Sequence, residues 1–227
     1  MLIRDGLAQA RATGGGGFSY TVPPQRRAEL DFYRNNVIHH FIAYAIIAAA
    51  LRALPAAVPA AGRVERDARW LSRLFKLEFI YRVGTRFEAI FSETHATMTH
   101  LGLTGPGDEE RVAFLAQMVR PLLDAYRAAT ATLGSWSGGD QRSFVASALE
   151  RAREEAAAGR ALPESVSKAT LENAAAWLTA EGAFQPSPEG NDRLLVSPLW
   201  RAGRARQLIA EIDRFGSRLR SSFGARD

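Results

Sequence analysis

The chain has 227 residues, no cysteine, a formal net charge of +5, 47% hydrophobic residues and 23% charged residues. These values are ordinary for a globular protein and allow one large domain or two small ones. The absence of cysteine excludes disulfides, thiolate chemistry and cysteine-ligated zinc. Only Lys76 and Lys168 are lysines, so nearly all of the 29 basic residues are arginines. We attribute this skew to base composition rather than to a binding function.

Residues 1–23 form a lead-in to the first long helix. We expect a short helical piece, then the glycine run 14–17, then a short strand over 18–22. No Gly-Lys-Ser/Thr follows the glycine run, so a flexible turn is favoured over a phosphate-binding loop. The first residues also lack the apolar segment of a secretory signal peptide, and a cytoplasmic location is therefore expected.

The first long helix is expected from about Arg26 to Leu54. Its second half is almost purely apolar, with an uninterrupted run over residues 41–51. A helix that spans a bilayer needs roughly 20 apolar residues, and this run of 11 is much shorter. The pattern therefore predicts a helix buried in the core of the protein rather than a membrane span.

The first half of the same helix carries polar residues at helical spacing. Asn35 and His39, and likewise Asn36 and His40, are four residues apart and therefore share a helix face. Asparagine is a poor residue for a helix interior, which indicates partners elsewhere in the fold. We predict a structural polar lock or domain interface made of Tyr33, Arg34, Asn35, Asn36, His39, His40 and Glu78.

Glu78 belongs to the second long helix, which is expected over residues 64–82. It lies among Leu77, Phe79 and Ile80 in a strongly apolar context. A lone buried carboxylate is expensive, so Glu78 either points to solvent or is buried with a partner. Both alternatives stay open from the sequence, with Arg34 or the amides of the first helix as the partners to test.

Three further helices follow. One is expected over residues 87–101, and another begins after Asp108 as its N-cap and is kinked by Pro121. Asp140 is the expected N-cap of the next helix, which ends near Gly159.

The last third of the chain is predicted to contain short strands as well as helices. Ser167 is the expected N-cap of a helix through residue 181, and Gly182 fits its C-terminal left-handed position. Residues 183–185 and 194–197 then predict a two-stranded hairpin, and an amphipathic helix ends the chain. The fold class expected is mostly α, with a multi-helix module (24–134) followed by a winged-helix-like module (140–220) that contains one small β-hairpin.

The sequence offers little sign of catalytic or metal-binding residues. His95 and His100 are five residues apart, the wrong spacing for two ligands on one helix face, and we expect no metal and no cofactor. No Gly-x-Ser-x-Gly elbow is present. The helix after Ser167 would face a nucleic-acid groove in a winged helix, but it offers few basic residues beyond Lys168, so nucleic acid is the less favoured partner.

Two segments resemble the C-terminal helical region of the glycerol-3-phosphate acyltransferase family. Tyr33, Asn35, His39 and Phe41 match a Tyr-x-Asn-x-x-x-His-x-Phe segment of that region. Residues 76–81 are similar to its second segment, in which Glu78 and Phe79 match. The segment 121–126 and the later hairpin are also similar, so the resemblance covers about residues 1–220.

The resemblance implies a link to acyl transfer onto the sn-1 hydroxyl of glycerol 3-phosphate. Enzymes of this family use a His-x4-Asp motif, and no histidine of this chain is followed by Asp at that spacing. The general base of the reaction would therefore be missing, and no catalytic residue can be carried over. Whether the chain is an enzyme is thus left uncertain.

The expected function is therefore that of an accessory or C-terminal domain in phospholipid biosynthesis, encoded separately or cut at a start codon. The expected partners are an acyltransferase catalytic domain and an anionic membrane surface at the inner face of the membrane. The alternatives are a winged-helix nucleic-acid-binding protein and a small enzyme that uses His39 or His40.

Overall fold

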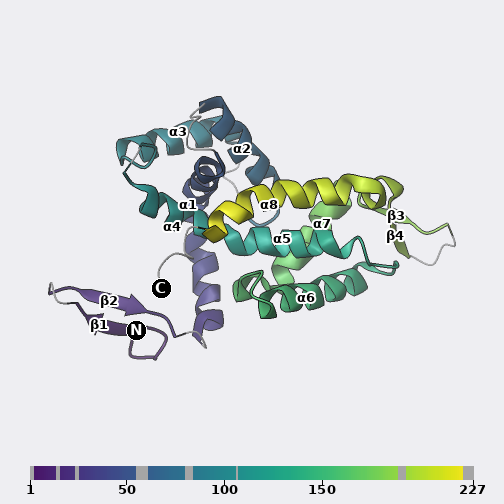
Figure 1. Ribbon diagram of the computed structural model, residues 1–227, viewed down its shortest axis with the longest axis horizontal. Helices are drawn as coiled ribbons and strands as arrows, with labels where there is room; N and C mark the ends of the chain where they lie inside the picture. The colour runs from purple at the N-terminus through teal and green to yellow at the C-terminus, as the bar shows by residue number, and fades with distance from the viewer. Residues whose placement is uncertain are drawn as a thin grey trace. The chain divides into compact units, whose positions relative to one another are not determined.

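The computed structural model describes most of the chain and is mostly helical (Figure 1). The described residues are 3–13, 16–23, 26–54, 61–79, 84–105, 107–188 and 193–221, without the side chains of 27–37, 39, 61, 220 and 221. The chain divides into two compact units, Met1–His40 and Phe41–Asp227. The predicted mostly α-helical class is confirmed.

The helices and strands follow one another in a simple order. The first part of the chain contains β1 (Gln9–Ala12), β2 (Phe18–Thr21), α1 (Arg27–Ala53), α2 (Ala61–Leu74) and α3 (Phe87–His100). The second part contains α4 (Glu109–Gln117), α5 (Arg120–Thr132), α6 (Gln141–Ala157), η2 (Pro163–Ser165), α7 (Lys168–Ala180), β3 (Phe184–Pro186), β4 (Leu194–Val196), the π-helix η3 (Trp200–Arg204) and α8 (Ala205–Ser221).

The lead-in forms an antiparallel hairpin. The expected strand is confirmed as β2, but the short helix expected at the start is wrong for Gln9–Ala12, which pairs with β2 as strand β1. The hairpin turn lies at the glycine run, where the Thr13 N–H donates to the Gly17 carbonyl over 2.8 Å and Gly16 has a φ of +79°. Glycine adopts this left-handed conformation at little cost, which explains the run as a turn. The described residues thus contain two hairpins where one was predicted.

Helix α1 has the extent that the sequence predicts. From Ile42 onward its apolar half is buried, and Ala45, Ala48 and Ala50 are fully inaccessible to solvent. Small side chains let neighbouring helices approach closely, so this half forms part of the core of the second unit. Among the described residues, no helix combines the length and the apolar character that a membrane span requires.

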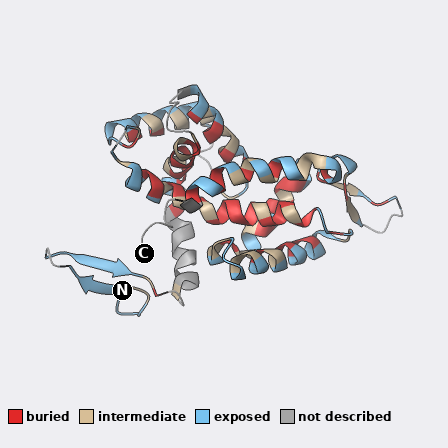
Figure 2. Cartoon of the chain, in the orientation of Figure 1, coloured by how far each residue is buried: buried red, intermediate tan, exposed pale blue. Residues whose placement is uncertain are grey.

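Helix α5 is the centre of the second unit. It packs against α6, α7 and α8, and most of its length is buried, as the red segment in Figure 2 shows. The sequence predicts one kinked helix at this place, whereas the structure has two, because α4 ends at Gln117 and α5 begins at Arg120. Pro121 therefore lies in the first turn of α5. Backbone N–H groups there have no acceptor within the helix, so the N–H that proline lacks costs no helical hydrogen bond.

The N-caps differ in how well the sequence predicts them. The Asp140 carboxylate accepts a hydrogen bond from the Ser143 N–H over 2.8 Å, as predicted. Asp108 stands before α4, but its carboxylate makes no capping bond and pairs instead with Arg111 over 3.1 Å. An arginine three residues on competes for the carboxylate, so the predicted capping role of Asp108 is wrong.

The hairpin between α7 and α8 is confirmed and lies against the start of α6. Strands β3 and β4 pair antiparallel, with Phe184 opposite Val196. The rings of Trp136, Phe144 and Phe184 meet edge to face, with centroids 4.9–5.6 Å apart. The helix, helix, hairpin, helix order is thus as predicted. The module boundary at residues 134–140 stays a prediction, and α5 packs directly on α6 across it.

Replacing the N-cap residue Ser167 by Ala tests the capping of α7. The Ser167 hydroxyl accepts a hydrogen bond from the Thr170 N–H over 3.3 Å. Loss of this bond should lower the free energy of unfolding by about 1 kcal/mol. Urea denaturation followed by far-UV circular dichroism measures the change. The matched control is Ser147→Ala on the exposed face of α6, which should change the unfolding free energy by less than about 0.5 kcal/mol.

Candidate functional site

Glu78 lies in the turn that follows α2. Helix α2 ends at Leu74, earlier than predicted, and residues 75–79 continue as turns, with the Glu78 N–H donating to the Phe75 carbonyl over 3.0 Å. Phe75 and Phe79 are both buried, and the Glu78 side chain between them is half-buried. The two phenylalanines anchor the turn in the core, which holds a carboxylate among apolar side chains.

The neighbours of Glu78 come from α5 and α7. Burial raises the pKa of Glu78 to about 7, and hydrogen bonding from Asn173 and Tyr126 acts in the opposite direction. One carboxylate oxygen, Oε1, is buried without a well-formed hydrogen bond among the described residues. The two hydrogen bonds are therefore too weak to offset the loss of water around the charge. Glu78 is thus half-buried beside Asn173 and Tyr126, which corresponds to neither alternative in full.

Aromatic contacts hold this polar cluster in place. The Tyr126 ring meets Phe75 edge to face at 5.5 Å, and it meets Trp177 at 6.3 Å. The indole N–H of Trp177 donates to the Arg73 carbonyl over 3.1 Å, which ties α7 to the last turn of α2. Glu78, Tyr126 and Asn173 therefore form a polar cluster at a junction of three helical segments, which we call the Glu78 cluster.

The chemistry available to the Glu78 cluster is limited. A carboxyl group whose pKa lies near neutrality is suited to proton transfer. However, the described side chains of His40, His95 and His100 are not hydrogen-bond partners of Glu78, and His95 instead stacks on Phe91 at 5.5 Å. Within the described residues, no three His, Cys, Asp or Glu side chains lie together as a metal ion would require. The Glu78 cluster therefore links the turn after α2 to α5 and α7.

The other residues of the predicted polar lock lie on α1. Its backbone is helical throughout, so the expected four-residue spacing applies, and His40 is exposed. The remaining side chains lie outside the described part of the structure: Tyr33, Arg34, Asn35, Asn36 and His39. The lock between α1 and Glu78 therefore stays a prediction.

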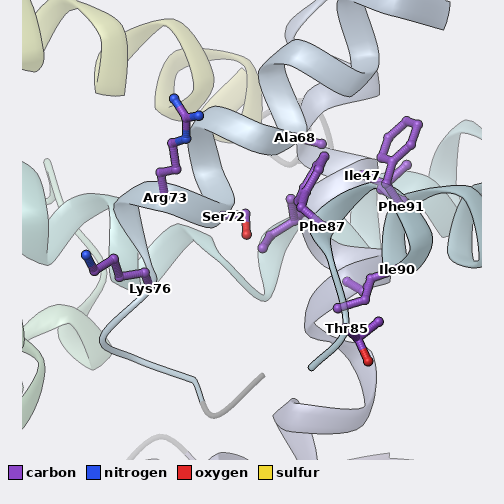
Figure 3. A pocket seen from close by; sticks show the side chains of 11 residues that line it. Ile47, Ala68, Ser72, Arg73, Lys76, Thr85, Phe87, Ile90 and Phe91 are labelled. Atoms are coloured by element: carbon purple, nitrogen blue, oxygen red, sulfur yellow. The ribbon is translucent and has the colours of Figure 1, made fainter. Parts of the chain in front are cut away.

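A separate apolar pocket lies between α1, α2 and α3. Its volume is about 280 Å³, and its apolar wall consists of Ala43, Ile46, Ile47, Ala68, Phe87, Ile90 and Phe91. Its polar lining consists of Ser72, Arg73, Lys76 and Thr85. In Figure 3, Arg73 and Lys76 lie on the left and Phe87 and Phe91 on the right; the Arg73 side chain extends upward and the Lys76 side chain extends away from the phenylalanines. No local sequence pattern indicates this pocket, because its wall combines three segments distant in sequence.

The residues that sequence reasoning missed are Tyr126 and Asn173. Tyr126 ends the segment 121–126, and Asn173 lies in the helix that follows Ser167. The signal for Asn173 was present, since it is an asparagine in the middle of an alanine-rich helix. The argument applied to Asn35 and Asn36 would have selected it as well.

Comparison with known families agrees with the two sequence segments. Comparison with curated proteins gives no match. The model of the family described as "Glycerol-3-phosphate acyltransferase C-terminal region" matches residues 2–187, which is most of the chain. This range contains the α1 segment, the Glu78 cluster and the wall of the apolar pocket. The chain therefore belongs to the family of glycerol-3-phosphate acyltransferase C-terminal regions.

Proposed function

We propose that this chain is a non-catalytic accessory region that works with an acyltransferase catalytic domain in phospholipid biosynthesis. The observation that carries the proposal is the family match over residues 2–187, together with the lack of a His-x4-Asp motif in the sequence. Acylation of glycerol 3-phosphate requires a base that takes the proton of the attacking hydroxyl.

The proposed role is to brace the catalytic domain and to dock near the membrane. The partner is an acyltransferase catalytic domain, in the same polypeptide or in a separate chain. The polar residues of α1 and the Glu78 cluster would serve as the lock or interface. A net charge of +5 favours approach to an anionic surface, and the proposed location is the cytoplasm and the inner face of the membrane.

The nucleic-acid alternative is less well supported by the charges at the start of α7. Lys168 forms an ion pair with Glu172 over 3.6 Å, which weakens the positive potential of this helix. The neighbouring cleft, of about 820 Å³, has Arg142 and Lys168 but also Asp140 and Glu172 in its lining. Acidic and basic groups thus offset each other where a phosphate backbone would need a basic surface.

The test combines the purified chain with an acyltransferase domain that carries His-x4-Asp. Alone, the chain should transfer no acyl group from an acyl thioester to glycerol 3-phosphate. Together, the two should co-elute in size-exclusion chromatography, and the catalytic domain should turn over faster or survive heating longer. The same mixture with an unrelated helical protein of similar charge is the control.

Two results would contradict the proposal. Acyl transfer by the chain alone that disappears in the His39→Ala, His40→Ala double variant would make it a self-contained enzyme. Duplex DNA binding that weakens steeply with salt, without any association with the catalytic domain, would favour the nucleic-acid alternative.

A further inference from the structure

The connection between β4 and α8 forms an ordered corner at the surface of the second unit. It consists of residues 197–204 and lies at the same end of the unit as the β3–β4 hairpin (Figure 1). Trp200 fixes the corner, because its side chain is only 2% exposed and its indole N–H donates to the Glu181 carbonyl over 3.3 Å. The Ser197 hydroxyl donates to the Gly182 carbonyl over 3.0 Å. Two hydrogen bonds therefore hold the corner against the end of α7.

Leu199 is exposed because of this anchoring. Its side chain is 71% accessible to solvent, more than any other large hydrophobic side chain that the structure describes. Leu199 has helical backbone angles (φ −60°, ψ −43°) and directly precedes buried Trp200, so it cannot turn inward without displacing the tryptophan. A single exposed leucine is common on protein surfaces and carries no inference alone. The charges around Leu199 give its exposure a meaning.

Three arginines follow this leucine without a counter-charge. Arg201 and Arg206 are exposed and Arg204 is half-buried, and residues 193–210 contain no Asp or Glu. Within the described residues none of the three pairs with a carboxylate, not even that of Glu181, whose backbone contacts the corner. Several arginines of other helices do pair with carboxylates: Arg69, Arg111, Arg127, Arg153 and Arg214. Base composition accounts for the number of arginines in the chain, but it does not place three unpaired ones so close together.

The charged side chains are held around the corner. The Arg204 guanidinium lies 5.9 Å from the centroid of the Trp200 ring. Arg206 donates to the Ala202 carbonyl over 2.9 Å, so its side chain folds back towards η3. At the rise of a helix, residues 199–206 extend over only about 10 Å. This is about one Debye length at moderate salt, so the three charges act on a partner as one patch.

We infer that residues 199–206, the Leu199 corner, are the surface by which the chain docks on a bilayer that contains anionic phospholipid. Leu199 would enter the boundary between head groups and acyl chains, and the three arginines would contact lipid phosphates. Nucleic acid is the poorer partner, because its phosphate backbone gains nothing from an exposed leucine. The inference rests on the membrane docking in the proposed function and names the surface for it. The family match ends at residue 187, so this surface lies outside the matched region.

Co-sedimentation with vesicles tests the charge requirement. The full chain is mixed with vesicles of phosphatidylcholine alone, or with mixed vesicles of seven parts phosphatidylcholine to three parts phosphatidylglycerol. Each arginine near an anionic bilayer strengthens binding about fivefold, so the chain should bind the mixed vesicles roughly 100-fold more tightly. Added salt should reduce this difference, because it screens the charges. Equal binding to the two kinds of vesicle would overturn the inference.

Two variants locate the docking surface. The double variant Arg201→Gln, Arg206→Gln should weaken binding to the mixed vesicles about 25-fold. Its matched control is Arg63→Gln, Arg66→Gln, which removes two exposed charges from α2 and should change binding less than about twofold. Leu199→Ser should weaken binding roughly threefold to tenfold, because less apolar surface is buried. Thermal unfolding checks that each variant is folded, which is expected because the substituted side chains are exposed.

Insertion at residue 199 has a direct readout, because the chain contains no cysteine. Leu199→Cys is labelled with nitrobenzoxadiazole, a fluorophore that is sensitive to its surroundings. On the mixed vesicles its emission should move to shorter wavelength and be quenched by spin-labelled lipid. The same label at Ser147→Cys, on the exposed face of α6, is the control and should show neither change. A bound chain without quenching at residue 199 would contradict the inference.

The failure of the inference differs from the failure of the proposed function. If the double variant binds the mixed vesicles as tightly as its control, the chain docks by another face, so the inference fails and membrane docking stands. If the unmodified chain does not bind them at all, membrane docking and the inference both fail, whereas association with the catalytic domain is unaffected. Duplex DNA that binds more tightly than the mixed vesicles, with an affinity that Leu199→Ser leaves unchanged, would assign the Leu199 corner to nucleic acid and overturn the inference.

Discussion

Replacing Phe215 by Ala should lower the free energy of unfolding by about 3–5 kcal/mol, the usual cost of deleting a buried phenylalanine side chain. Phe215 is only 1% exposed, and its ring stacks on Trp70 of α2 with centroids 5.2 Å apart. The adjacent Arg214 lies over the same ring and donates to both carboxylate oxygens of buried Asp67, over 2.7 and 2.9 Å. The substitution thus opens a cavity and loosens the ion pair that joins α2 to α8.

Urea denaturation followed by tryptophan fluorescence measures the effect, since the four tryptophans, Trp70 among them, report on unfolding of the chain. The matched control is Phe114→Ala on α4, whose side chain is 63% exposed and whose loss should cost less than about 0.5 kcal/mol. Phe215→Leu, which keeps most of the volume, should cost less than the alanine variant. A loss below about 1 kcal/mol in Phe215→Ala would show that α8 contributes little to the fold.

The helix boundaries that the sequence predicts well are those set by local chemistry. Asp140 and Ser167 cap α6 and α7 because their short side chains reach a backbone N–H three residues on. Gly182 ends α7 with a φ of +77°, which glycine adopts at little cost. In each case, the residue type at the boundary accounts for it: a carboxylate or hydroxyl that accepts from the backbone, or a glycine without a Cβ.

The boundaries that the sequence misses depend on contacts with distant residues. The apolar pattern of α2 continues past Leu74, but Phe75 and Phe79 are buried in turns, where Phe75 meets Tyr126 of α5. Strand β1 contains alanine and arginine, which favour helix, and it pairs with β2 because the turn at the glycine run brings them together. A tertiary contact overrides local preference at the end of α2, and pairing across a short turn does so at β1.

The sequence predicts that Glu78 needs polar neighbours if it is buried, but it does not predict which residues these are. An apolar context indicated that Glu78 needs neighbours if it is buried, and the structure supplies Asn173 and Tyr126. These residues lie far from Glu78 in sequence, and no local pattern links the three. The apolar pocket was not predictable for the same reason, since Arg73 and Phe91 share it only after α2 and α3 have packed.

Replacing Glu78 by Gln should stabilise the protein at pH 8 and have a much smaller effect at pH 5. Burial raises the pKa of Glu78 to about 7 from an ordinary value of 4.5. Between these two values the folded chain holds a proton that the unfolded chain has released, so the free energy of unfolding falls as pH rises through this range. The full difference between the two pKa values corresponds to roughly 3 kcal/mol of unfolding free energy. Partial solvation of the side chain reduces the stabilisation expected for Glu78→Gln to about 1–3 kcal/mol.

Urea denaturation at pH 5 and pH 8 measures the free energy of unfolding of Glu78→Gln and of the unmodified chain. The expected stabilisation is the first value minus the second. The matched control is Glu93→Gln on the exposed face of α3, which should show no such growth with pH. Tyr126→Phe provides a second check, because hydrogen bonding from Tyr126 lowers the pKa of Glu78 and its loss should extend the pH dependence upward. A Glu78→Gln variant that is less stable than the unmodified chain at pH 8 would contradict this prediction, since it would mean that partners of the ionised carboxylate more than offset the cost of its burial.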